Sequence, residues 1–451
     1  MISRSLRSLI ILFFDLTTVI GLFSLVYYLR LEKLPNYLHL DLWLVVFTFI
    51  ITFFVSGTYS RSRSTKLPRL PVRTFFISGL AGLICIFWVY LSGPYEFNNY
   101  FGRGVLPIGT ILVGITATLS RFLINRAHHN KEVGIKLLYL GFSDSGQAFL
   151  NELKNHSEVR SVSLVTNKTL ENSFEKIKII KIDKLISALN NQWYRIIIDP
   201  SHHSRPDETN QLVALRLSGT RIMSLAEYYE QEWYMVPVHH IKDDWFLQSQ
   251  GFSMVSNPIS LRIKRIIDIL LALVLLIATS PLVLLSAILI KLTSKGPVFF
   301  KQTRVGFKGD LFTIYKLRTM IRNAEKNGAQ WASNDDPRVT IIGNFLRKSR
   351  LDELPQCWNV LKGDMSFVGP RPERPEFTKD LADCIPYYNL RHTVKPGITG
   401  WAQVIFPYGA SQEDALKKLQ YELYYIKNQS LLLDLNVILR TSITVFQRTG
   451  R

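Results

Sequence analysis

Residues 266–290 read IIDILLALVLLIATSPLVLLSAILI, an apolar run long enough to cross a bilayer as one helix. Basic residues flank both ends of the run, and Ser280-Pro281 interrupts its middle. Because proline lacks the backbone N–H and clashes with the preceding turn, it bends or breaks a helix, and a serine hydroxyl can satisfy the freed carbonyl. The run therefore predicts a re-entrant helix–break–helix that enters the membrane and returns to the same face. The alternative is an ordinary kinked span that places the C-terminal part outside.

Four further apolar runs lie upstream, at residues 9–29, 42–57, 75–92 and 105–123, and each approaches the length of a spanning helix. Basic residues are concentrated before the first run, between the second and third, and after the fourth, whereas the other two loops carry few. Basic loops favour the cytoplasm. The alternation predicts a four-helix transmembrane bundle over residues 1–130 with both ends in the cytoplasm. A buried bundle in a soluble protein is the alternative.

The 451-residue chain has room for two or three domains, and 47% of its residues are hydrophobic. Its formal net charge of +19 suggests an anionic partner, which could be nucleic acid, acidic lipid or a phosphorylated substrate. The three cysteines, Cys85, Cys357 and Cys384, have no paired spacing. This argues against a disulfide framework or a zinc site, and for a reducing compartment around the soluble parts.

Residues 131–229 change to short apolar runs that alternate with helical patterns. Strands are expected at 135–140, 159–165, 176–182 and 194–199, which favours a parallel, Rossmann-like α/β domain. The turn from Gly141 to Gly146 lacks the middle glycine of a dinucleotide fingerprint, and no carboxylate ends the second strand. A structural or regulatory domain is therefore favoured over NAD chemistry. Residues 230–261 are interpreted as a linker, with His239 and His240 as loop residues rather than metal ligands.

The chemistry is concentrated in residues 347–376, RKSRLDELPQCWNVLKGDMSFVGPRPERPE. Adjacent carboxylates, Asp352 and Glu353, lie between a basic cluster and a stiff Arg-Pro segment. A carboxylate can bind Mg²⁺ or attack phosphorus, and an arginine can hold phosphate oxygens through two parallel hydrogen bonds. Pro355 predicts a helix that begins near Leu351 or Asp352, with a dipole that favours ionised Asp352. Ser349-x-x-Asp352 also fits a capping box, so Asp352 could be only a helix cap.

Further motifs surround this stretch: KLRTM at 316–320, DPRVT at 336–340, KPGITGWAQV at 395–404 and YYIKN at 424–428. Together with LDELPQ, GPRPE and the Ser-Pro break, and in this order, they closely resemble the bacterial sugar transferase family from about residue 264 to the C-terminus. These are the monotopic phosphoglycosyl transferases that start surface-glycan synthesis. The four apolar runs and the Rossmann-like domain look like its large branch, which includes undecaprenyl-phosphate glucose and galactose phosphotransferases.

The resemblance implies that residues 262–451 form an α/β catalytic domain with the re-entrant helix, on the cytoplasmic face of a bacterial inner membrane. Such enzymes transfer a sugar-1-phosphate from a UDP-sugar to polyprenyl phosphate and release UMP, through a covalent aspartyl-phosphosugar. Asp352 matches the nucleophile and Glu353 its partner, and both are candidate Mg²⁺ ligands. The candidate substrate-binding residues are Lys316, Arg318, Arg347, Arg371, Glu373 and Gln403. Lys316 and Arg318 could instead bind lipid headgroups.

The expected partners are thus a UDP-sugar, polyprenyl phosphate and membrane lipid, with no nucleic acid, and the N-terminal helices or the middle domain could mediate a homodimer. Two other functions stay open. One is a non-enzymatic scaffold or nucleotide sensor for glycan assembly, against which the intact Asp-Glu pair argues. The other is a conventional inverting glycosyltransferase, which would release UDP, and no D-x-D motif supports it.

Overall fold

The computed structural model describes residues 4–38, 40–56, 58–59, 70–91, 104–129, 135–153, 159–166, 177–189, 191, 193–241, 243–254, 257–321, 324, 336–406 and 411–446. The chain divides into two compact units. One unit contains residues 128–250, and the other contains residues 1–127 together with 251–451. Most of the basic loop expected between the second and third apolar runs falls at residues 60–69, outside the described residues, whereas its last basic residue, Arg73, belongs to the third helix.

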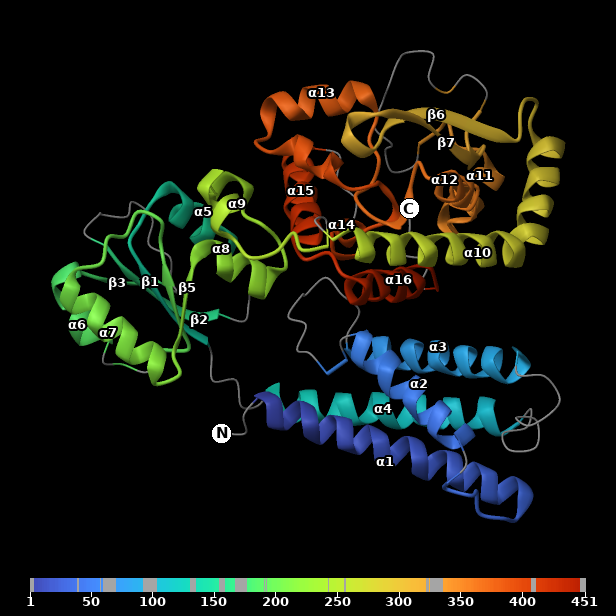
Figure 1. Cartoon of the computed structure of the whole chain (residues 1–451), viewed down its shortest axis with the longest axis horizontal. Coiled ribbons are helices and arrows are strands. Elements are labelled where there is room, and N and C mark those ends of the chain that lie inside the picture. The colour runs from blue at the N-terminus through green and yellow to red at the C-terminus, as the bar shows by residue number, and fades with distance from the viewer. Residues whose placement is uncertain are drawn as a thin grey trace. The chain divides into compact units, whose positions relative to one another are not determined.

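Several apolar helices lie near the N-terminus: α1 (Arg4–Leu31), α2 (Leu40–Val55), α3 (Leu70–Leu91) and α4 (Val105–His129) (Figure 1). They share one core, to which Phe23, Phe49, Ile77 and Val113 contribute, one from each helix. Many other large apolar side chains of these helices are exposed, as expected for surfaces that face lipid. Within α1 and α4, residues Leu9–Leu31 and Val105–Leu123 are long and apolar enough to cross a membrane, whereas Leu40–Val55 and Thr74–Trp88 are shorter.

A buried ion pair joins the first and last of these helices. The two guanidinium nitrogens Nη1 and Nη2 of Arg121 lie 2.6 and 2.5 Å from the carboxylate oxygens of Asp15. Both side chains are almost fully buried. Charges in an apolar helical environment are costly unless they are paired, so this contact fixes the register of α1 against α4.

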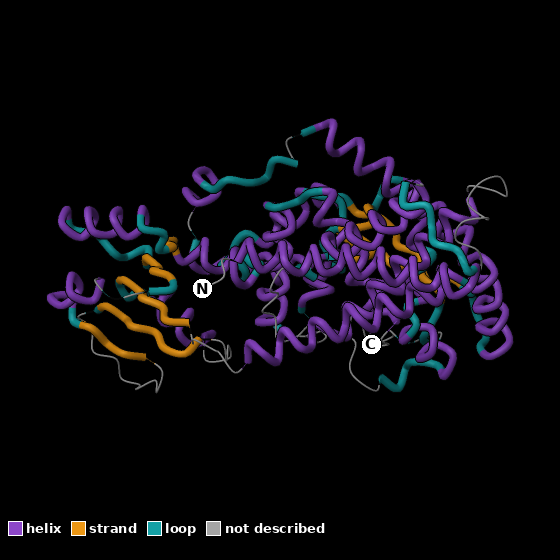
Figure 2. Tube along the Cα trace, turned by 90° about the horizontal axis from the view of Figure 1, so that it is seen from below, coloured by secondary structure: helices purple, strands orange, loops and turns teal. Residues whose placement is uncertain are grey.

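The unit of residues 128–250 is built on a five-stranded parallel sheet in the order β3-β2-β1-β4-β5. Its strands are among the orange segments of Figure 2. The strands are β1 (Ile135–Leu140), β2 (Val159–Val165), β3 (Ile177–Ile180), β4 (Arg195–Ile198) and β5 (Arg221–Ser224). The helices between them are α5 (Asp144–Leu153), α6 (Leu185–Leu189) and α7 (Pro206–Leu217). The strand order reverses beside β1, as in doubly wound folds. β1 to β4 lie close to the four ranges that the sequence predicts, whereas β5 was not predicted.

The region predicted as a linker is largely part of this α/β unit. Residues 230–250 contain a turn of π-helix (Tyr229–Trp233), a 3-10 turn (Val238–His240) and α9 (Asp243–Gln248). Met235, Val236 and Val238 are buried, and the Trp233 ring lies 5.5 Å from the ring of Phe149 on α5. These apolar side chains complete the core of the unit, so residues 230–250 of the predicted linker belong to the α/β unit and the remainder belongs to the other unit.

The turn after β1 holds a carboxylate where a dinucleotide would place its phosphates. Asp199, at the end of β4, accepts hydrogen bonds from Tyr139 Oη at 2.5 Å, Ser143 Oγ at 2.8 Å and Ser201 Oγ at 2.6 Å. Burial opposes its ionisation, but these donors outweigh burial and hold the pKa of Asp199 below its ordinary value. Gly141 has a φ of +90°, and a Cβ there would lie 2.9 Å from His202 Cβ. A buried negative charge at this turn fits the structural interpretation of this domain.

The C-terminal module of the other unit is a mixed α/β region. It begins with α10 (Pro258–Thr293) and a hairpin of β6 (Phe299–Val305) and β7 (Leu311–Leu317). It continues through α11 (Ile341–Lys348), a 3-10 turn (Leu351–Glu353), α12 (Gln356–Lys362), β8 (Ser366–Val368) and α13 (Pro375–Cys384). A second 3-10 segment (Tyr388–Thr393) then leads to β9 (Gly397–Thr399), α14 (Trp401–Ile405), α15 (Gln412–Lys427) and α16 (Leu431–Phe446). The parallel pair β8–β9 joins the segments on either side of α13.

The long apolar helix α10 bends instead of breaking. It is assigned as one helix with Pro281 inside it, and Figure 1 shows the bend between its two limbs. Pro281 cannot donate to the carbonyl of Ile277, and Ser280 Oγ donates to that carbonyl at 2.8 Å. The serine therefore satisfies the group that the proline frees, as the sequence predicts. In the most apolar 18-residue stretch of α10, only 11% is buried. The helix therefore exposes apolar side chains along its length.

Polar contacts fix the first limb of α10 to the module. Arg265 Nη1 and Nη2 donate to the carbonyls of Val360 and Leu361, 2.6 and 3.0 Å away, at the C-terminal end of α12. Lys264 Nζ lies 2.6 Å from Asp434 Oδ2. A cation at a helix C-terminus is stabilising, and α12 directly follows the Asp-Glu pair. The apolar helix therefore helps to set the position of that pair.

Candidate active site

The Asp-Glu pair lies in a short 3-10 turn, Leu351–Glu353, between α11 and α12. Arg350 precedes the turn in the left-handed conformation, with a φ of 59°. Ser349 Oγ donates back to the carbonyls of Phe345 and Leu346, which makes it the end of α11. The capping box predicted as an alternative is therefore wrong. The α-helix itself begins at Gln356 with Pro355 as its cap, later than predicted, because the 3-10 turn occupies the residues before the proline.

Glu353 is held by cations on several sides. Lys316 Nζ and Arg371 Nη2 each lie 2.8 Å from Glu353 Oε1, and Arg350 Nη1 lies 3.5 Å from Oε2. Burial opposes ionisation of this carboxyl, but the charges of Arg371, Lys316 and Arg350 outweigh it and hold the pKa of Glu353 well below its ordinary value. Glu353 is therefore ionised and already neutralised by its neighbours.

The pKa of Asp352 is shifted in the opposite direction. It is 8% exposed, and its Oδ1 has no hydrogen-bond partner among the residues that the structure describes. Burial, and then the adjacent charge of Glu353, raise the pKa of Asp352 to about 6, against the lowering effect of Lys316 and Arg347. The predicted stabilisation of the ionised form by a helix dipole is thus outweighed. A desolvated carboxylate with an unbonded oxygen is a stronger nucleophile, or a better metal ligand, than a solvated one.

Arg347 and Lys316 lie around the dyad as predicted, whereas Arg318 and Glu373 have other contacts. Arg347 Nε donates to Thr319 Oγ1 at 3.0 Å, and its charge lowers the pKa of Asp352. Arg318 is buried at the end of α10, where Nη2 donates to the carbonyl of Ser294 at 2.8 Å. Glu373 lies 3.7 Å from Arg304. These contacts join elements of the module, and substrate binding by Arg318 and Glu373 stays a prediction.

Gln403, on α14, lies with Arg371 in the wall of a narrow pocket that has no room for a water molecule. Gly369, Pro370, Gly400 and Trp401 also line it. Gln403 Oε1 is buried and has no hydrogen-bond partner in the described part of the chain. Because Arg371 also contacts Glu353, it links this pocket to the dyad. Gln403 therefore offers an unused acceptor to a ligand that reaches Arg371.

The carboxylates of the dyad suit a magnesium ion unequally. Among the described residues no group of three or more His, Cys, Asp or Glu side chains is placed to hold a metal. Mg²⁺, however, is commonly bound by one or two carboxylates together with water and substrate phosphate. Asp352 fits this role because its buried Oδ1 has no partner, whereas Glu353 is already neutralised by Lys316 and Arg371.

The structure also identifies contacts that sequence reasoning missed. Arg350 contacts Glu353, and Arg391 holds the backbone of Arg371 from a distant part of the chain. Arg350 had a weak signal, because it belongs to the basic cluster before the dyad. Arg391 had none, because a single arginine outside the quoted motifs does not reveal a buried contact to a residue 20 positions away.

Comparison with known proteins places these elements in a family. The model of the bacterial sugar transferase family matches residues 259–448. A Bacillus subtilis protein described as an uncharacterized sugar transferase is 42% identical over 183 residues, which are 40% of this chain and 85% of that protein. The chain belongs to the bacterial sugar transferase family. The bacterial sugar transferase region begins in α10 and includes the dyad, the Arg371 segment and Gln403.

Two relatives are named by their reactions. The UDP-N-acetylgalactosamine-undecaprenyl-phosphate N-acetylgalactosaminephosphotransferase of Aeromonas hydrophila is 46% identical over 226 residues, which are 48% of this chain and 53% of that protein. The UDP-glucose:undecaprenyl-phosphate glucose-1-phosphate transferase of Xanthomonas campestris pv. campestris is 44% identical over 191 residues, which are 42% of this chain and 40% of that protein. The chain thus matches about half, or less, of the length of these relatives.

Proposed function

We propose that this bacterial sugar transferase moves a sugar-1-phosphate from a UDP-sugar to polyprenyl phosphate and releases UMP. One observation carries the proposal: the two carboxylates of the dyad have different contacts. Asp352 is buried with an oxygen that has no hydrogen-bond partner among the described residues, whereas Glu353 is held by Lys316 and Arg371. The reactions named for the Aeromonas and Xanthomonas relatives are of this class.

The transfer is proposed to proceed in two steps. An oxygen of ionised Asp352 attacks the phosphorus that carries the sugar, the bond from that phosphorus to the bridging oxygen breaks, and UMP leaves with the electron pair. A phosphate oxygen of polyprenyl phosphate then attacks the same phosphorus, and the Asp352 carboxylate leaves. Two steps let the two anionic substrates use one site in turn, which predicts ping-pong kinetics.

Cations around the dyad supply the charge that this chemistry requires. Lys316, Arg347, Arg350 and Arg371 all act on the dyad electrostatically. Preorganised positive charge stabilises the charge that develops on phosphoryl oxygens. Mg²⁺ held by Asp352 and substrate phosphate would supply further positive charge at the same place. Gln403 and Arg371 are proposed to bind the donor.

The membrane arrangement is part of the proposal. The N-terminal helices α1–α4 form a transmembrane bundle, and α10 is re-entrant, so that the catalytic module faces the cytoplasm of a bacterial inner membrane, where UDP-sugars are made. Three features support it: the lengths of the apolar helices, the bend at Pro281 and the exposed apolar surface of α10. Association into a homodimer stays a prediction.

A screen of UDP-sugars tests the activity. The purified full chain is supplied with Mg²⁺, undecaprenyl phosphate and, in turn, UDP-glucose, UDP-galactose and their N-acetylated forms. We expect UMP release with at least one donor, its loss in Asp352→Ala and Asp352→Asn, and normal rates in the matched variant Asp380→Asn, which changes an exposed carboxylate on α13. UDP as the product would support an inverting glycosyltransferase, and turnover in both Asp352 variants would reject this nucleophile.

A further inference from the structure

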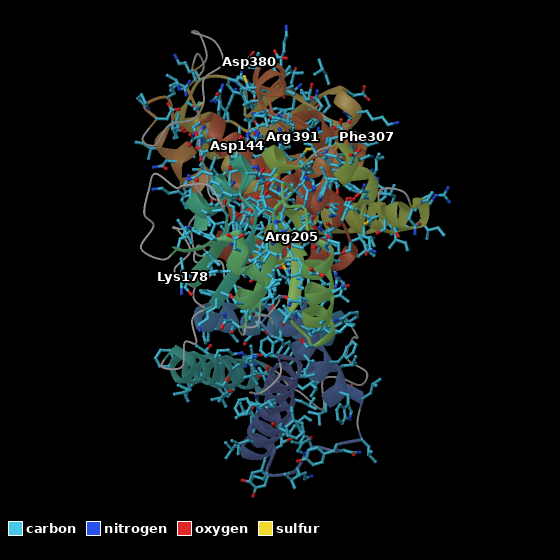
Figure 3. The ribbon with its side chains drawn as sticks, turned by 90° about the vertical axis from the view of Figure 1, so that its left-hand side faces the viewer. Asp144, Lys178, Arg205, Phe307, Asp380 and Arg391 are labelled. Carbon is cyan, nitrogen blue, oxygen red and sulfur yellow. The ribbon has the colours of Figure 1, made fainter. Side chains whose placement is uncertain are left out.

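Arg371 is held from behind by a buried arginine. Arg391, in the 3-10 segment Tyr388–Thr393, donates from Nη2 to the backbone carbonyl of Arg371 at 2.8 Å. Arg391 is 4% exposed and lies inside the C-terminal module, where Figure 3 labels it. The side chain of Arg391 is therefore joined to the backbone of Arg371, and it is Arg371 that contacts the dyad.

Every nitrogen of the Arg391 guanidinium has a partner. Nε and Nη2 donate to the two carboxylate oxygens of Glu422 on α15, at 2.9 and 2.8 Å, and Nη1 donates to Tyr388 Oη at 2.7 Å. Such a fork-to-carboxylate contact fixes the plane of the guanidinium, which a lysine cannot reproduce. The hydrogen bond from Arg391 to the Arg371 carbonyl is consequently held in a defined direction.

The segment around Arg371 has little freedom of its own. Pro370 and Pro372 flank it and fix their own φ angles, and the next residue, Glu373, accepts a backbone hydrogen bond from Val305 at 3.0 Å. With its carbonyl fixed by Arg391, the Arg371 backbone directs its side chain to Glu353 Oε1, 2.8 Å away. The chain of contacts thus runs from Glu422 through Arg391 and Arg371 to the dyad.

The buried Arg391–Glu422 pair calls for an explanation beyond stability. Taking two charges out of water costs several kcal/mol for each ion, and apolar side chains of similar volume often stabilise a core as well or better. A buried charged pair is easier to explain where it fixes one arrangement of its surroundings. Here the group that it fixes is the main chain of a residue that contacts the dyad.

We propose that Arg391 is a positioning residue for sugar-phosphate transfer, which acts by holding the main chain of Arg371 so that its guanidinium stays on Glu353. The inference rests on the proposed function and adds to it a residue that touches neither carboxylate of the dyad in the described contacts. Glu422 and Tyr388 orient Arg391 in turn.

A double-mutant cycle tests the inference. Arg391→Lys keeps the charge beside Glu422 but cannot make all four hydrogen bonds. We expect its UMP release to fall by about tenfold to a hundredfold, as for a small misplacement of a catalytic group, with the folded structure retained by circular dichroism. In an Arg371→Ala background the same change should cost little more, because its effect passes through Arg371. The matched control is Arg374→Lys, in the same segment, which should keep its rate.

The pH profile separates positioning from a merely structural role. With Arg371 displaced, the Glu353 charge is less neutralised, so Asp352, which also faces Lys316, Arg347 and Arg350, should ionise at higher pH. On the acid side of the pH profile, UMP release by Arg391→Lys should therefore reach half of its maximum at a higher pH than in the unmodified chain. Equal losses from Arg391→Lys with and without Arg371, or an unmoved acid limb, would overturn the inference.

The inference and the proposed function fail in different ways. Absence of UMP release from the unmodified chain rejects the proposed function alone. The cycle is then measured by the rise in Tm on adding UDP-sugar, which needs no turnover. The two arginines are coupled if each single variant, Arg391→Lys or Arg371→Ala, diminishes the rise in Tm and the double variant diminishes it no further. Additive effects would contradict it.

Discussion

At residue scale, the pKa values of the adjacent carboxyls Asp352 and Glu353 shift in opposite directions because their neighbours differ. Glu353 is surrounded by three cations, whereas Asp352 is buried beside the negative charge of Glu353. Sequence reasoning predicted the pair and its basic surroundings, since LDELPQ and the flanking arginines are local features. It could not predict which carboxylate each cation would neutralise, because Lys316 and Arg371 approach Glu353 from separate parts of the chain.

Replacement of Asp352 by Asn should stabilise the fold while it abolishes activity. The pKa of Asp352, about 6, is above the ordinary value of 3.8, so this carboxyl binds its proton more tightly in the folded state than in the unfolded state. As the pH rises from about 4 to above 6, its ionisation therefore lowers the stability of the fold. A shift of about two units corresponds to at most about 3 kcal/mol at neutral pH. Thermal unfolding should show a higher Tm for Asp352→Asn at pH 7.5 and a much smaller difference near pH 4. An equal difference at both pH values would contradict the raised pKa.

Removal of the Glu353 charge should move the acid limb of activity to lower pH. In Glu353→Gln, Asp352 loses a negative neighbour while Lys316 and Arg371 remain, so Asp352 ionises more readily. The rate at neutral pH should also fall, since Arg371 loses its ion-pair partner. The measurement is UMP release between pH 5 and 8. The control is Glu376→Gln, which changes an exposed carboxylate on α13. An unchanged midpoint would show that Glu353 does not set the ionisation of Asp352.

At element scale, the bend of α10 is the feature that the sequence predicts best. Ser280 and Pro281 act through one carbonyl, that of Ile277, and such a local device can be recognised without tertiary contacts. The contact that Arg318 makes could not be predicted in this way. Its KLRTM motif suggests a phosphate or lipid ligand, yet its guanidinium holds the end of α10 at Ser294.

Cysteine labelling tests the re-entrant arrangement with the chain's own residues. Cys384 on α13 is exposed, whereas Cys85 and Cys357 are buried. A membrane-impermeant maleimide should therefore label Cys384 in inverted vesicles and not in intact spheroplasts, with Cys384→Ser as the control. In Pro281→Ala the helix regains its backbone donor, and about 3 kcal/mol of helix propensity, so part of the population should straighten, label from outside and lose activity. Labelling of the unmodified chain from outside would contradict a re-entrant α10.

At the scale of the whole molecule, the chain contains the bacterial sugar transferase region and an α/β unit. The α/β unit extends to residue 250, beyond the boundary at residue 229 that was predicted from the sequence. Alternating strands and helices predicted the parallel sheet, because that pattern is local. Residues 230–250 were interpreted as part of a linker because they are rich in Trp, His and Asp. Their place in the core depends on contacts such as that of Trp233 with Phe149, which only the folded chain brings together. The same limit hid Arg391, whose partners Arg371 and Glu422 are far from it in sequence.

The α/β unit should not respond to nicotinamide dinucleotides. Asp199 fills the turn after β1 with a negative charge, and a pyrophosphate there would be repelled. Neither NAD⁺ nor NADH should raise the Tm of the full chain or alter its UMP release. A saturable rise in Tm with either dinucleotide would show that this turn binds a ligand.

The covalent step is tested most directly by trapping it. The full chain is mixed with its UDP-sugar and Mg²⁺ in the absence of polyprenyl phosphate, quenched, and examined by peptide mass spectrometry. We predict release of about one equivalent of UMP, together with a sugar-phosphate adduct on the peptide that contains Asp352, and neither in Asp352→Asn. Transfer to polyprenyl phosphate at full rate, with no UMP released and no adduct formed before the lipid is added, would contradict an aspartyl nucleophile.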